Sequence, residues 1–288
     1  MTTLLTVIND VCGVLKIPRT DTVVSSSDQT YSHLLALAHK EVTEIVNLYE
    51  WAELQKTHTI TLQNGVTEYA LPSDFLKLLP STEWNRAEQW RLYGPLTPQE
   101  WQSRESGLLD VIVRTEYRIK NNKIHIRPTP TASTAGNILA FEYQCSQCIR
   151  PKNWVTNTSF SPGSYCYSND KVYYTTAGGT TGATAPSHSS GTVTDGTVLW
   201  TYSSDPYTRF TADTDVFVLN PYYFTLGIEW RWKAENGFDY SKSKKKYMDY
   251  MSATAANNKG AQMFYFGSGV QRINYTDLVN IPDTGYGS

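Results

Sequence analysis

The chain has 288 residues and a formal net charge of −2, and 40% of its residues are hydrophobic. This length can bury a core, and the small net charge excludes recruitment of nucleic acid by overall electrostatics. The N-terminal residues lack the basic region of a signal peptide, and no apolar run approaches the roughly 18 residues of a membrane span. Four cysteines predict no disulfide framework and favour synthesis in a reducing cytoplasm.

Two helices are predicted near the N-terminus. Apolar residues recur at helical spacing within Leu4–Leu15. A second helix begins after Ser27 or Asp28 as N-cap, carries an apolar stripe within Tyr31–Tyr49, and extends to about Trp51–Leu54. We expect the two helices to form a hairpin within a bundle.

The hydrophobic period then changes to that of β-strands. Asn64-Gly65 suits a tight hairpin turn, and Asn121–Asn122 marks a second turn. Strands are expected at His58–Leu62, Glu68–Leu71, Val111–Val113, Tyr117–Ile119, Lys123–Arg127 and Ile138–Tyr143. This pattern predicts an antiparallel β domain.

Helical signals return near the C-terminus. Asn220–Pro221 has the form of an N-cap followed by proline at the first helical position. Asn236–Gly237 interrupts the pattern, and Asp239 can cap one more helix. The predicted fold class is therefore α+β, with a helical bundle formed from residues 1–55 and 207–259 and the β domain, residues 56–151, inserted between them.

Residues 152–206 differ from the sequence on either side. They are rich in Gly, Thr and Ser and carry few charges, with short strands expected at Tyr165–Tyr167, Lys171–Thr175 and Val198–Tyr202. We interpret them as a small additional β module. The expected domain order is thus bundle, β domain, inserted module and second part of the bundle.

Residues 260–288 are predicted to form an extended C-terminal arm, because they have many apolar groups but no sustained helical or strand period. The expected contacts with a partner are Met263, Phe264, Tyr265, Phe266, Val270, Ile273, Tyr275 and Leu278. The alternative is that the arm packs on its own subunit.

No complete catalytic, cofactor or metal site is predicted. Cys145 and Cys148 have the spacing of zinc ligands but lack two further ligands nearby, so ordinary buried cysteines are favoured. His188-Ser189 lacks the context of a nucleophile and its base. Asp213 and Asp215 could act as a metal or acid/base pair, but a turn or cap role is favoured.

The strongest charge cluster consists of Lys242, Lys244, Lys245 and Lys246. One interpretation is the solvated face of the last helix. The other is a positive cluster that faces DNA in a channel or an acidic partner.

Three segments carry a resemblance to a known family. They are Trp51-x-x-Leu54 with the following THTITLQNGVTEYALPSDFLKL, then YRIKNNKIHIRPTP (Tyr117–Pro130), and FTADTDVFVLNPYYFTLGIEWRWKAENGFDYSKSKKKY (Phe210–Tyr247). Together they resemble the head-to-tail adaptor proteins of short-tailed bacteriophages, the tail tubular protein A family. Residues 152–206 interrupt the pattern as an insertion.

The resemblance implies a structural protein of the virion, assembled in the host cytoplasm, with no enzymatic activity, no cofactor and no membrane contact. It implies a ring, commonly of twelve subunits, that sits beneath the portal protein at the head–tail junction. The ring would extend the channel through which DNA passes without sequence-specific binding, and would attach the tail nozzle.

The inserted module allows two alternative functions. Exposed tyrosines and tryptophans could bind host glycans or tail fibres, which would make the chain a tail-associated carbohydrate-binding protein. A glycan hydrolase would need paired carboxylates beside a cleft, and the module has only sparse aspartates.

Overall fold

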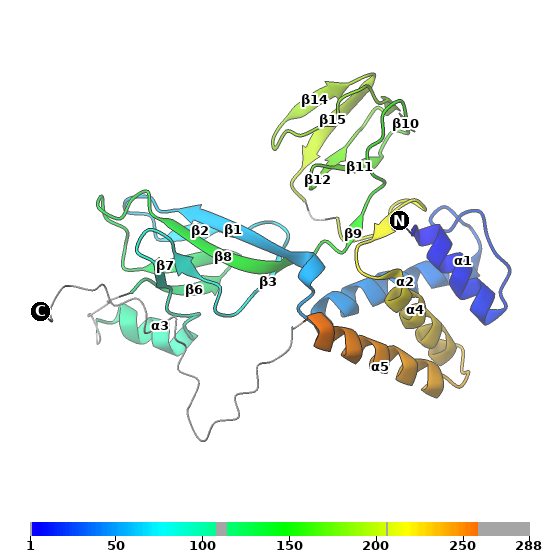
Figure 1. Cartoon of the computed structure of the whole chain (residues 1–288), viewed down its shortest axis with the longest axis horizontal. Coiled ribbons are helices and arrows are strands. Elements are labelled where there is room, and N and C mark those ends of the chain that lie inside the picture. The colour runs from blue at the N-terminus through cyan, green and yellow to red at the C-terminus, as the bar shows by residue number, and fades with distance from the viewer. Residues whose placement is uncertain (1, 108–113, 206, 259–288) are drawn as a thin grey trace, which may run out of the picture. The chain divides into compact units, whose positions relative to one another are not determined.

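The computed structural model describes residues 2–107, 114–205 and 207–258 of the chain. Helices and antiparallel sheets both occur, which confirms the predicted α+β class (Figure 1). Residues Gln55–Gln144 form one compact unit, and the described residues before and after this range form the other. No helix in the described ranges has the length and apolar content to span a membrane.

Four helices belong to the unit that contains both ends of the described chain. They are α1 (Leu4–Leu15), α2 (Gln29–Leu48), α4 (Pro221–Glu235) and α5 (Ser241–Asn258). The caps confirm two sequence predictions, because the side chains of Asp28 and Asn220 accept hydrogen bonds from the N–H groups of Thr30 and Tyr222.

Helix α2 ends at Leu48, earlier than the sequence predicted. The Trp51 indole donates to the Ile45 carbonyl at 2.8 Å, so the chain turns back over the last turn of the helix and buries Trp51 completely. A short 3₁₀ helix, η1 (Ala52–Leu54), follows. Burial of the large indole therefore takes the place of a longer helix.

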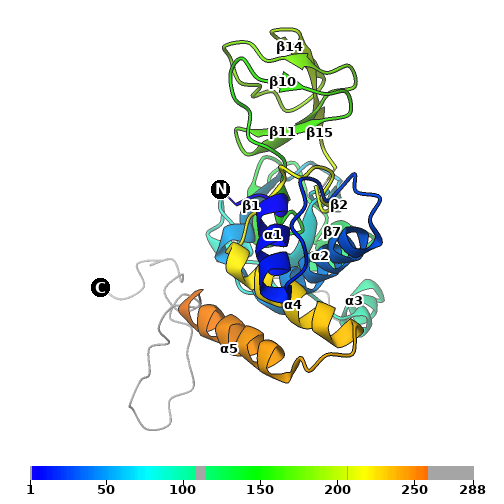
Figure 2. The same cartoon turned by 90° about the vertical axis from the view of Figure 1, so that its right-hand side faces the viewer.

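Helix α4 is the centre of the helical packing. It packs against α1, α2 and α5 (Figure 2). The sequence predicted that α1 and α2 pack on each other as a hairpin. This prediction is wrong for the main contact of each helix, because α1 and α2 both pack mainly against α4. The reason is that α4 buries side chains around much of its circumference, namely Tyr223, Phe224, Leu226, Ile228 and Arg231.

Beside these helices, a short β-ladder joins segments that are far apart in the sequence. Strand β9 (Ile149–Arg150) pairs with β16 (Val216–Phe217), and the N–H of Leu4 donates to the carbonyl of Asp215 at 2.8 Å. These hydrogen bonds connect the start of α1 to the segment that leads into α4.

The described residues of the Gln55–Gln144 unit form two sheets and α3 (Pro98–Glu105), and the strand expected at Val111–Val113 lies outside the described residues. The first sheet has the order β1-β8-β4-β5, and β3 also pairs with β8. The strands are β1 (Gln55–Thr61), β3 (Phe75–Leu78), β4 (Trp84–Asn85), β5 (Trp90–Arg91) and β8 (Ile138–Cys145). The second sheet has the order β2-β7-β6 and consists of β2 (Glu68–Ala70), β6 (Glu116–Lys120) and β7 (Lys123–Arg127).

The turn at Asn64-Gly65 does not close a hairpin, which corrects the sequence prediction. Strand β1 pairs with β8 and β2 pairs with β7, so the turn carries the chain from one sheet to the other. Gly65 has a φ of 77°, and its N–H donates to the Pro130 carbonyl. The hairpin instead lies at Asn121–Asn122, where both residues have positive φ and join β6 to β7.

Residues 152–206 contain a four-stranded antiparallel sheet of order β11-β12-β15-β14 and a two-stranded ladder of β10 and β13. The strands are β10 (Ser159–Phe160), β11 (Tyr165–Ser168), β12 (Lys171–Tyr174), β13 (Gly179–Thr180), β14 (Thr192–Asp195) and β15 (Val198–Ser203). Their core consists of Phe160, Cys166, Tyr173, Val198 and Trp200. The three strands expected from sequence are present as β11, β12 and β15.

Candidate functional site

Helix α5 carries the lysine cluster, and buried contacts fix its position. The Ser241 N–H donates to the Asp239 carboxylate at 3.0 Å, as the sequence predicted for a cap. Tyr247 and Met251 face the core and are 3% and 1% exposed. The Tyr247 hydroxyl donates to Glu41 of α2 at 2.8 Å. The orientation of α5 is therefore set by polar as well as apolar burial.

Glu41 and Arg231 form a buried ion pair between α2 and α4. Arg231 is also paired with Glu44 at 2.6 Å. Burial raises the pKa of Glu41 to about 7, while the Arg231 guanidinium and the Tyr247 hydroxyl act in the opposite direction. The Glu41 carboxylate occupies the space over Gly227, because a Cβ on this glycine would lie only 2.5 Å or less from three of its atoms.

The lysines of the cluster do not all face the same way. Lys242, Lys245 and Lys246 line one surface hollow with a volume of about 530 Å³. The Nζ atom of Lys244 instead lies over the Trp230 ring, 5.4 Å from its centroid. Helical geometry explains this division, since residues three and four positions apart share a face.

We call the surface formed by Tyr222, Lys242, Lys245, Lys246, Asp249 and Tyr250 the lysine hollow. Tyr222 and Tyr250 meet edge to face with ring centroids 4.9 Å apart. The Lys246 ammonium lies 5.4 Å from the centroid of the Tyr222 ring. A hydrogen bond with Tyr222 is the main cause that raises the pKa of Lys246, so this lysine stays charged at neutral pH.

The lysine hollow is positively charged. Among the described residues, none of its three lysines forms a salt bridge, and all three are exposed. Asp249 is the carboxylate that lines the hollow, whereas Glu229 and Asp239 act on its lysines by longer-range attraction. The arrangement can bind an anionic group by charge attraction.

The other residues predicted to bind a partner cannot be placed. Met263, Phe264, Tyr265, Phe266, Val270, Ile273, Tyr275 and Leu278 lie outside the described residues.

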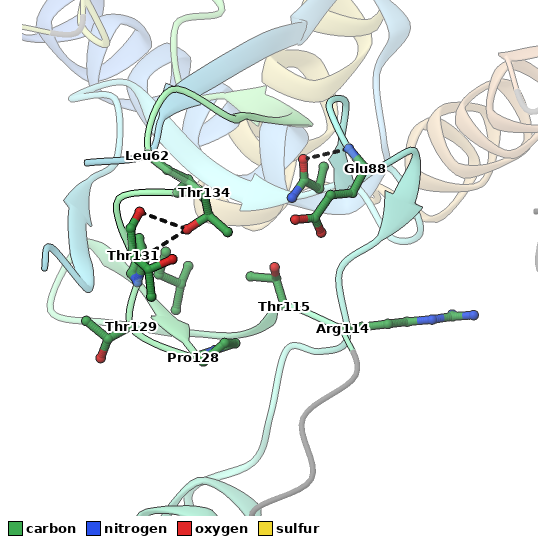
Figure 3. A pocket seen from close by; sticks show the side chains of 11 residues that line it. Leu62, Glu88, Arg114, Thr115, Pro128, Thr129, Thr131 and Thr134 are labelled. Carbon is green, nitrogen blue, oxygen red and sulfur yellow. Dashed lines mark hydrogen bonds between the residues drawn. The ribbon is translucent and has the colours of Figure 1, made fainter. Parts of the chain in front are cut away.

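A second hollow lies within the Gln55–Gln144 unit, and no sequence motif predicts it. It has a volume of about 220 Å³ and is lined by threonines, prolines, Glu88 and Arg114 (Figure 3). Thr131 and Thr134 bond to each other across the loop, and Glu88 accepts from Asn137 at 3.3 Å. Most of the polar groups named here already form hydrogen bonds within the chain. The hollow therefore does not present a set of side chains arranged for catalysis or ligand binding.

The cysteines and the histidine that are candidates for metal or catalytic chemistry are buried or packed against other side chains. Cys145 and Cys148 are buried thiols, and burial raises the pKa of Cys148. Within the described ranges, no three potential ligands gather around a common point. The His188 ring packs on Tyr173 with centroids 4.8 Å apart, and its carbonyl accepts from the Tyr173 hydroxyl.

Asp213 and Asp215 accept hydrogen bonds from the backbone, as the favoured turn interpretation predicted. Asp213 accepts from the N–H groups of Val23 and Val24, both at 2.9 Å. Asp215 accepts from the N–H groups of Thr211 and Ala212 and from the Tyr207 hydroxyl. The two aspartates therefore fix loops.

Asp195 organises the module at residues 152–206. Its carboxylate accepts from the Trp154 indole at 2.7 Å, the Trp200 indole at 3.2 Å and the Gly182 N–H at 2.7 Å. Trp200 is fully buried. Both tryptophans that could have stacked on sugar rings are thus held by an internal carboxylate.

The sequence of the chain matches a known protein family. The model of the SU10 adaptor protein family matches residues 2–165, more than half of the 288 residues. The match includes α1, α2 and the whole Gln55–Gln144 unit, and ends before α4 and α5. A search of curated proteins found no match. The predicted resemblance to phage head-to-tail adaptors is confirmed: the chain belongs to the SU10 adaptor protein family, a family of structural proteins of phage virions.

Proposed function

We propose that the chain is the head-to-tail adaptor of a short-tailed phage and forms a ring beneath the portal. The ring extends the DNA channel and provides the platform on which the tail nozzle assembles. The family match is the observation that carries this proposal. The resemblance of residues 210–247 to the same class of protein supports it independently, because this segment lies outside the matched range.

In this proposal the parts of the chain have separate roles. Residues 1–55 and 207–259 form a helical bundle, residues 56–151 the β domain, and residues 152–206 a projecting module. The contacts of α4 with α1 and α2 support a bundle built from both parts of the chain. Residues 260–288 form the arm that docks on the portal through the apolar side chains given above.

The module is not proposed to bind carbohydrate. That interpretation called for exposed tyrosines and tryptophans, but Trp200 is fully buried and both Trp154 and Trp200 donate to Asp195. The sparse charges of the module equally leave a hydrolase without its pair of carboxylates.

Truncation after Lys259 tests the role of the arm. The truncated chain is expected to remain folded, with unchanged helical circular dichroism, and to lose its binding to purified portal particles in a sedimentation assay. The full-length chain is the control. Retained portal binding by the truncated chain would exclude the arm as the anchor, and aggregation would show that the arm covers its own subunit.

A further inference from the structure

We propose that the lysine hollow of α5 binds the phosphate backbone of duplex DNA without sequence specificity. The hollow brings the ammonium groups of Lys242, Lys245 and Lys246 to one surface beside two tyrosines. The inference goes beyond the proposed adaptor role and does not depend on ring formation.

The first argument is the uneven distribution of charge. The whole chain has a formal charge of −2, but α5 contains four lysines and one aspartate. The positive charge is therefore concentrated near the start of α5 in an otherwise acidic protein. Such local asymmetry is typical of contact with a polyanion.

The second argument is that the lysines are exposed and form no salt bridge with any described residue. Lys242, Lys245 and Lys246 are exposed and form no salt bridge among the described residues, so their charges are available to a ligand. Lysine binds phosphate as a point charge and requires no fixed geometry, which suits binding without sequence specificity. Tyr222 adds a phenolic hydroxyl at the same surface and is 39% exposed.

The third argument separates DNA from an acidic protein segment. Lysine is depleted in protein–protein interfaces, because its long side chain must be ordered and its charge desolvated. Phosphate contacts instead gain from counterion release and leave the lysine partly hydrated. A surface whose three lysines form no salt bridge with any described residue therefore fits a nucleic acid backbone better than a protein partner.

The fourth argument is the adjacent end of α4. Tyr222 follows Pro221, the first residue of α4, so the positive end of that helix dipole lies at the hollow. This adds to the attraction from the lysines. Asp249 acts against it, since its carboxylate lines the same surface.

The test measures binding of a short mixed-sequence DNA duplex to the full-length chain by fluorescence anisotropy across a salt series. If three lysines each neutralise one phosphate, the slope of log K against log salt is about −2.7, and affinity falls roughly 40-fold between about 50 and 200 mM salt. A triple variant with Lys242, Lys245 and Lys246 replaced by Gln should lose most of this slope.

The matched control replaces Lys16, Arg86 and Lys120 by Gln, which removes the same charge at exposed positions elsewhere. The control should keep the wild-type slope. Asp249→Asn should strengthen binding several-fold at low salt, whereas Asp10→Asn on α1 should change it little. Circular dichroism verifies that each variant is folded.

Three results would overturn the proposal. Equal slopes for the wild type and the hollow variant would show that DNA does not bind there. An equal loss in both triple variants would show a bulk charge effect. Binding of polyglutamate without binding of DNA would assign the hollow to an acidic protein segment. None of these results would affect the adaptor role, which is tested by attachment to the portal.

Discussion

Gly227 of α4 is the position at which the helical packing can be tested most sharply. A Cβ atom here would lie 2.1 to 2.5 Å from the carboxylate carbon and both oxygens of Glu41. Glu41 is fully buried, so it cannot move into solvent without leaving Arg231. Gly227→Ala must therefore displace the buried ion pair or separate α2 from α4.

The magnitude follows from two opposing effects. Alanine in a helix is favoured over glycine by about 1 kcal/mol. Breaking a buried ion pair costs about 3–5 kcal/mol. The net expectation is a loss of about 2–4 kcal/mol in the free energy of unfolding, because the clash involves a buried carboxyl group that is paired with Arg231.

The assay is urea unfolding followed by helical circular dichroism. Gly13→Ala in α1 is the matched control, since the nearest atom to its added Cβ is the Arg19 Nη2 atom at 3.8 Å. The control should be neutral or stabilised by up to about 1 kcal/mol. In a Glu41→Ala background, Gly227→Ala should cost much less than in the wild type. Equal effects of the two glycine substitutions, or an unchanged cost without Glu41, would refute the reasoning.

Two further predictions follow from single contacts, and a third concerns the module at residues 152–206. Asp195→Asn keeps one acceptor oxygen but replaces the other by an NH2 donor, so at least one of three hydrogen bonds is lost and the module should be destabilised by about 1–3 kcal/mol in urea unfolding followed by tryptophan fluorescence. Asp170→Asn, at an exposed turn, should cost less than about 1 kcal/mol. His39 accepts the Phe210 N–H through Nε2, and burial followed by the nearby Arg209 charge lowers the pKa of His39 below 6.5. The folded state therefore binds fewer protons than the unfolded state at acidic pH. The difference in stability between the wild type and His39→Gln should be largest above about pH 6.5 and should shrink as the pH falls below it. A difference that grows on acidification would contradict this assignment. Deletion of residues 152–206 should leave the helical circular dichroism signal of the remaining chain unchanged. Loss of that signal would show that the module is part of the helical core.

Local signals predicted many of the elements because they depend on neighbouring residues. The period of Leu4–Leu15, the caps at Asp28 and Asn220, and the strand Lys123–Arg127 all appear where the sequence placed them. Helix α3 was missed although Thr97 and Glu100 form a capping box. It has no buried residue, so the hydrophobic pattern on which the prediction relied is absent there.

Long-range pairings could not be predicted from local patterns. Asn64-Gly65 has the composition of a hairpin turn, yet β1 pairs with β8 far along the chain. The contact of Glu41 with Gly227 joins residues of α2 and α4 that no spacing relates. The helical period separates Lys244 from the other three lysines, but the contacts of these lysines with Tyr222 and Trp230 of α4 could not be predicted from it.

Electron microscopy of the purified chain mixed with the portal protein of the same phage tests the central claim most directly. The adaptor proposal predicts closed rings attached coaxially to one end of the portal particle, and a longer channel than in the portal alone. Portal particles that remain bare at saturating amounts of folded chain would contradict it.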